Sequence, residues 1–166
     1  MFRTAGDFDR ADWELLRHGA ITLFWREERF EASKAELGAL GYRLLEIACV
    51  TPSQFRRAVS EALGWGDGAW DGNLNALNDG FAAFPFGDCP DVAICLRDFH
   101  VIAGEEPAFA HGVLDIIEDW SRNHLLTGRR LLALVQTNDV NFRCEGLGGR
   151  SASWNAAEWL NAVREL

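Results

Sequence analysis

The chain has 166 residues, is 48% hydrophobic and carries a formal net charge of −9. This length is typical of one domain with a substantial core, and the apolar content excludes a disordered chain. No apolar run reaches the roughly 18 residues of a membrane helix, and the first residues lack the apolar segment of a signal peptide. We therefore expect a cytoplasmic protein without membrane contact, whose four unpatterned cysteines are reduced.

The negative charge is concentrated in one segment of the chain. Residues 61–120 contain 12 acidic side chains against one basic side chain, Arg97, which leaves a formal charge of −11. Such a segment repels phosphate, so we expect no nucleic-acid partner. It attracts a basic protein, although a solvated and solubilising surface has the same composition.

The N-terminal part of the chain alternates between helix and strand patterns. Residues 12–18 are expected to form a short helix capped by Asp12, and the apolar run from Ala20 to Trp25 is expected to form a strand. A second helix is predicted over 28–40. The largely apolar segment from Tyr42 to Val50 predicts a strand in the centre of a sheet.

A strong helix start follows at Thr51, which is expected to cap a helix whose first turn contains Pro52. Beyond this helix, residues 65–84 read as a glycine-rich loop with two tryptophans and then a short helix, which Asp71 or Asn73 can cap. The helical spacing of its apolar residues predicts one buried stripe, formed by Leu74, Leu77, Phe81 and Phe84. The polar residues Asn75, Asn78 and Asp79 fall on the opposite side.

The second half of the chain continues the alternation. Strands are expected over 91–96 and 131–136, with a loop or irregular helix over 98–107 and a long helix from Phe109 to about Leu126 between them. Helical crossovers between strands predict an α/β fold with a small, mostly parallel sheet of about four strands and helices packed on it. We expect one domain over 1–138. Residues 139–166 are expected to form a tail with a glycine-rich link and a terminal helix from Trp154 to about Val163.

The run from Asn73 to Asp79 resembles the motif N-L-D-A-L-x-D of the barstar family, which are small intracellular ribonuclease inhibitors. The order of elements from Tyr42 to Gln136 is also similar to barstar, and residues 12–41 resemble an N-terminal extension of longer members. The resemblance implies that the loop and the short helix plug a nuclease active site. In that site Asp79 would imitate a substrate phosphate and contact cationic side chains.

Several positions depart from the family pattern. Asn75 replaces the first acid of the motif, and Trp70 has the place of one loop aromatic, while Ala69 stands where a second is expected. The family has a third acid on the long helix, and its position aligns here with Arg122 or Asn123. Glu118 and Asp119 lie one turn before this position and could substitute for it. The departures imply a target other than barnase or a lower affinity. The residues expected to contact the partner are Trp70, Asp71, Asn73, Asn75, Asn78, Asp79, Glu118 and Asp119.

Two alternatives stay open. The same fold could be a binding module whose partner is not a nuclease, and Trp70 could be a lid over the core instead of an interface anchor. A small α/β enzyme could use His100, near Asp98, or His111, one turn before Asp115, as a metal or acid–base group. Neither histidine has a third partner at a telling spacing, and no established catalytic motif is present. We therefore expect no catalysis, metal or cofactor.

Overall fold

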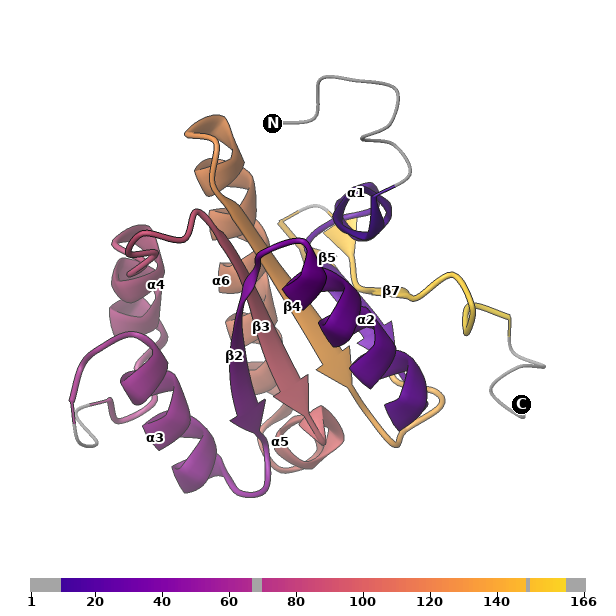
Figure 1. The fold of residues 1–166 in the computed structure, drawn as a ribbon. Helices are drawn as coiled ribbons and strands as arrows, with labels where there is room; N and C mark the ends of the chain where they lie inside the picture. Colours follow the sequence, from indigo (N-terminus) through magenta and orange to yellow (C-terminus); the bar gives the residue numbers. More distant parts are fainter. Residues whose placement is uncertain (1–9, 67–69, 149, 161–166) are drawn as a thin grey trace.

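The computed structural model describes residues 10–66, 70–148 and 150–160 (Figure 1). Five strands form one sheet in the order β2-β3-β4-β1-β7, in which every neighbouring pair is parallel. These strands are β1 (Ile21–Phe24), β2 (Arg43–Ala48), β3 (Asp91–Arg97), β4 (Arg130–Gln136) and β7 (Ser153–Trp154). A separate antiparallel hairpin consists of β5 (Glu145–Leu147) and β6 (Arg150–Ser151). The helices are α1 (Ala11–Leu16), α2 (Glu27–Ala39), α3 (Pro52–Ala62), α4 (Leu74–Ala82), α5 (Phe99–Glu105) and α6 (Pro107–Leu126).

The predicted α/β fold is confirmed, because all four predicted strands lie in one parallel sheet. Helix α2 covers one face of this sheet, and α3, α4 and α6 lie against the other (Figure 1). The central strands β3 and β4 are buried along almost their whole length because helices cover both of their faces. Within the described residues, no helix is both long and apolar enough to cross a membrane.

Strand β2 lies at an edge of the sheet, so its predicted central position is wrong. One side of the strand packs into the core through Leu45 and Ile47, but Glu46 on its other side is exposed. The Lys34 ammonium of α2 lies 2.6 Å from the Glu46 carboxylate. This ion pair joins α2 to the exposed side of β2. The largely apolar sequence of β2 therefore does not mean that both of its faces are buried.

The start of α3 agrees with the sequence prediction, whereas the start of α1 does not. The Gln54 N–H donates to Thr51 Oγ1 at 3.2 Å, and Pro52 is the first residue of α3. Asp12 is not the cap of α1, because it lies inside the helix and is fully buried. Its carboxylate is engaged by side chains from distant parts of the chain.

Asp12 is the centre of a buried ionic network at the amino ends of the strands. Its carboxylate accepts hydrogen bonds from Arg10 (2.8 and 2.9 Å), from Tyr42 Oη (2.9 Å) and from Arg130 Nη1 (2.8 Å). Arg130 also binds both carboxylate oxygens of Asp91. Burial alone would raise the pKa of Asp12, but the hydrogen bonds from Arg10 and Tyr42 and the arginine charges outweigh it and lower the pKa. The network thus fastens α1 to β3 and β4.

The C-terminal segment is part of the same sheet. Strand β7 pairs with β1, and residues 155–160 form turns, so the predicted terminal helix is wrong over the described residues up to 160. The fully buried Glu158 carboxylate accepts the N–H groups of Trp25 (3.0 Å) and Arg26 (2.8 Å) where α2 begins. These bonds fasten the segment after residue 138 to the β1–α2 corner.

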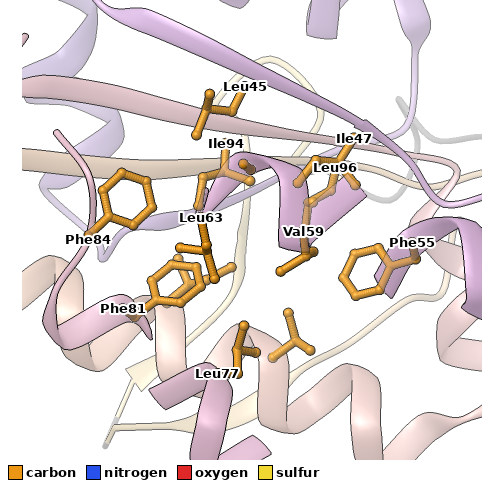
Figure 2. A pocket seen from close by; sticks show the side chains of 13 residues that line it. Leu45, Ile47, Phe55, Val59, Leu63, Leu77, Phe81, Phe84, Ile94 and Leu96 are labelled. Atoms are coloured by element: carbon orange, nitrogen blue, oxygen red, sulfur yellow. The ribbon is translucent and has the colours of Figure 1, made fainter. Parts of the chain in front are cut away.

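The core between the sheet and α3, α4 and α6 contains one small apolar cavity of about 20 Å³. Figure 2 shows the surrounding side chains, among them Leu77 and Phe81 of α4 and Phe55 and Val59 of α3. A cavity lined only by apolar groups offers water no hydrogen-bond partner. The buried side of α4 therefore contacts the core through apolar side chains.

We predict that Asp12→Asn lowers the free energy of unfolding by about 3 kcal/mol at neutral pH, because it removes the buried charge that pairs with Arg10 and leaves Arg130 with Asp91 as its remaining partner. The pKa of Asp12 is lower in the folded chain than its ordinary value of 3.8, so the stability that it contributes is present above that value. It is lost as the pH falls through the folded pKa. Urea unfolding from pH 7 to pH 2 should show the two proteins converging in acid. Equal stability at pH 7 would contradict the role given to this network.

We predict that Leu77→Ala lowers the free energy of unfolding by about 2–5 kcal/mol, because Leu77 is fully buried and already borders a cavity. Leu126→Ala is the matched control, since Leu126 is 86% exposed. The control should change stability by no more than about 0.5 kcal/mol. Similar losses for the two variants in chemical unfolding would show that α4 does not rest on this core.

Candidate partner-binding face

Helix α4 begins at a tightly bonded cap. Asn73 Oδ1 accepts the N–H groups of Asn75 (2.9 Å) and Ala76 (3.4 Å), so the prediction that Asn73 could cap the helix is confirmed. Asp71 Oδ1 accepts the N–H of Asn73 at 2.9 Å. Trp70 Nε1 donates to the carbonyl of Asn73 at 2.8 Å. These contacts give Asp71 and Asn73 a structural role in fixing where α4 starts.

Two glycines allow α4 to approach its neighbours closely. A side chain at Gly80 would collide with the Trp65 ring, and a side chain at Gly112 of α6 would collide with Leu74. Leu77 and Phe81 are buried below the helix. Helix α4 therefore packs directly against the Trp65 ring, against α6 and against the core.

Two hydrogen bonds from α6 add to this packing. Trp120 Nε1 donates to Asn78 Oδ1 at 2.9 Å, and His124 Nε2 lies 2.9 Å from the carbonyl oxygen of Phe81. The Trp120 and His124 rings lie 5.7 Å apart between their centroids. Nothing in the sequence spacing indicates that Trp120 has a polar partner 42 positions away. The bond from Trp120 orients the Asn78 amide and leaves its N–H groups available.

Asn75, Asn78 and Asp79 are exposed on α4, on the side away from the buried stripe. The Asp79 carboxylate has no hydrogen bond or ion pair with any residue in the described ranges. The side chain of Asn75, one turn earlier, likewise has none among them. The face thus combines an uncompensated carboxylate with two amides on a helix that is fixed along its length.

Trp70 does not belong to the exposed face. It is 5% exposed, and its ring packs 5.7 Å from the Phe109 ring and 6.4 Å from the Trp65 ring, measured between centroids. It therefore closes the core beneath the loop instead of presenting an aromatic anchor. Ala69 lies outside the described residues.

Glu118 is also placed differently from the prediction. It is 4% exposed, and its Oε2 accepts the N–H of Ala20 at 2.6 Å, so it fixes the start of β1 instead of meeting a partner. Asp119 is exposed and lies close to Gly148, and Arg122 Nη2 of the same helix lies 3.4 Å from its carboxylate. The same Arg122 group donates to the carbonyl of Gly148.

The acidic segment is partly neutralised by bases from elsewhere in the chain. Asp91 is paired with Arg130, and Glu106 is paired with Arg56. The acids of this segment that are exposed in the described ranges are Glu61, Asp71, Asp79, Asp88, Glu105 and Asp119. Charge counting alone therefore overestimates the negative surface.

The histidines considered for catalysis are bonded to the backbone. His111 Nε2 lies 2.8 Å from the carbonyl of Glu145, while Asp115 accepts the N–H of Gly148 at 2.8 Å. His100 Nδ1 accepts the N–H of Asn138 at 3.3 Å. In the part of the chain that is described, no three histidine, cysteine or acidic side chains gather as a metal site would require.

Comparisons of the chain with protein-family models, with curated proteins and with solved structures find no match in any of the three. The case for a partner at the α4 face therefore rests on the resemblance of its sequence motif and on the geometry of the helix.

We predict that Glu118→Ala lowers the free energy of unfolding by about 1–3 kcal/mol, because the buried N–H of Ala20 loses its acceptor. Asp119→Ala removes the same charge from the next position, where the carboxylate is exposed, and should cost no more than about 0.5 kcal/mol. Urea unfolding of both variants compares the two positions directly. If the Asp119 variant is the less stable one, the assignment of the two acids is reversed.

Proposed function

We propose that this chain is a protein inhibitor that blocks a basic ribonuclease or related toxin with α4 and the loop before it, in the manner of the barstar family. The observation that supports this most is the Asp79 carboxylate, which is unpaired among the described residues and stands on a helix held by Gly80, Gly112 and Trp120. Within the family motif, Asp79 occupies the position of the second acid. The chain itself performs no chemistry in this proposal.

The energetic argument follows from the state of Asp79 before binding. Its carboxylate is solvated and free, so binding does not require an existing ion pair to be broken. A ribonuclease site is lined with cations, which can form charge-assisted hydrogen bonds to this group. Since α4 is already fixed, little conformational entropy is lost when it docks. The exposed acids nearby would speed the encounter with a basic partner.

The amides of α4 would set the specificity of this interaction. Asn75 hydrogen-bonds without charge at the position where the family has its first acid. Asn78 has its oxygen occupied by Trp120, so its N–H groups favour an acceptor on the partner. The partner would therefore combine cations opposite Asp79 with an acceptor opposite Asn78.

A second candidate is a binding module for a basic protein that is not a nuclease. Two observations favour it over barnase-like inhibition: the motif carries one acid instead of two, and Trp70 is buried below the loop. Both candidates use the same helix face and differ only in the partner.

We predict that Asp79→Ala weakens binding to the partner by about 2–5 kcal/mol, because truncation leaves the partner's cations buried and unpaired. The same change should alter the stability of the free chain by no more than about 0.5 kcal/mol. Calorimetry with a barnase-type ribonuclease, at low and high salt, tests the inhibitor proposal. Asn75→Asp should increase that affinity by restoring the first acid of the motif.

Asp88→Ala is the matched control, since Asp88 is an exposed acid outside α4. It should bind like the unmodified chain. If Asp79→Ala instead lowers the melting temperature sharply and binds normally, the interface lies elsewhere. If neither the chain nor Asn75→Asp binds the ribonuclease, while Asp79 is required to capture another basic protein, the binding module is the better description.

A further inference from the structure

A second candidate site lies at the carboxyl edge of the sheet, and it shares no lining residue with α4. An open cleft of about 580 Å³ lies between α5, the start of α6 and the segment that follows β4. This volume is typical of small-molecule sites, and the carboxyl edge is where open parallel sheets bind ligands. Among the residues that line the cleft are His100, Gly104, His111, Asp139, Phe142 and Arg143.

The position of His100 is fixed by a polar network at the ends of β3 and β4. Asp98 has left-handed backbone angles (φ 57°), which are unfavourable for a residue with a side chain. Its N–H donates to Gln136 Oε1 at 2.9 Å, and its carboxylate accepts from Asn138 Nδ2 at 3.2 Å. The N–H of Asn138 then donates to His100 Nδ1. A neutral His100 therefore carries its proton on Nε2 and can donate it to a ligand.

The basic side chain that lines the cleft is that of Arg143. Arg143 forms no hydrogen bond or ion pair with any residue for which the structure gives a position. Among the neighbouring acids, Glu106 pairs with Arg56, whereas Asp139 and Asp98 each accept a hydrogen bond from a neutral N–H group and keep their charge. A guanidinium and an imidazole N–H that line the same cleft can both donate to a carboxylate.

Apart from His111, Asp139 and Asn141, the rest of the cleft lining is apolar. The half-buried Phe142 ring packs edge-on against the buried Phe99 ring, with centroids 6.0 Å apart. Nothing lies within 4 Å of the position where Gly104 would carry a Cβ atom, so the space above α5 is open. The buried Cys144 thiol stays protonated at neutral pH, because burial and, to a lesser extent, the charge of Asp115 raise its pKa to about 11. The lining therefore suits binding of an apolar group more than thiol chemistry.

We propose that this cleft binds a small organic carboxylate with an apolar body. Arg143 and His100 hold the carboxylate, and Phe142 with the adjoining apolar lining holds the body. The inference is independent of the partner of α4 and adds a small-molecule site to the chain.

The test is an NMR titration of the full, isotope-labelled chain with benzoate, using benzamide as the uncharged analogue. We expect saturable shifts of the amide resonances of residues 99–111 and 139–144 with benzoate. Arg143→Gln should weaken benzoate binding by about tenfold or more, because it removes the charge that pairs with the carboxylate. Arg57→Gln is the matched control, since Arg57 is exposed on α3, and it should leave the affinity unchanged.

Gly104→Leu provides a steric test, because the new side chain would enter the open part of the cleft. It should abolish the benzoate shifts while the remaining spectrum stays that of the folded chain. The proposal is overturned if benzoate causes no saturable shift in these residues. It is also overturned if benzamide binds as tightly as benzoate and Arg143→Gln has no effect.

Discussion

The close approach of α4 to its neighbours is the constraint on which the proposed binding face depends. Gly80 and Gly112 leave no room for a side chain, so the helix packs directly against Trp65 and against α6 through Leu74. Leu77 and Phe81 then fill the space above the sheet, where the remaining cavity is small (Figure 2). Because one side of the helix is fixed in this way, the direction of its exposed side chains is determined before any partner arrives.

Buried carboxylates hold the rest of the domain around this helix. Asp12 binds cationic side chains at the amino ends of the strands, Glu118 accepts the N–H of Ala20 just before β1, and Glu158 accepts two N–H groups where α2 begins. Each binds groups from a distant part of the chain, so each closes a long loop. The acids therefore divide into those that fasten the fold and those, such as Asp79, that form no hydrogen bond or ion pair among the described residues. This division explains why a formal charge overestimates the acidic surface.

The sequence predicted those features that depend on local patterns. Apolar runs identified the four longer strands, and the cap at Thr51 and the stripe of α4 followed from helical spacing. Features set by distant contacts were missed. Strand β7 has only two residues and forms because β1 offers a free edge, and the burial of Trp70 and Glu118 depends on Phe109 and Ala20. The exposure of Asn75, Asn78 and Asp79 follows from the helix period, but the bond from Trp120 to Asn78 does not.

The central claim is that α4 is a rigid platform in the free chain. Native-state hydrogen exchange of the free chain tests it most directly, because the helix-internal amides of residues 78–82 exchange only when α4 opens. The account predicts that these amides exchange no faster than those in the middle of α6, with free energies of opening close to that of global unfolding. Exchange of the α4 amides through a local opening of low free energy, with α6 still protected, would contradict it.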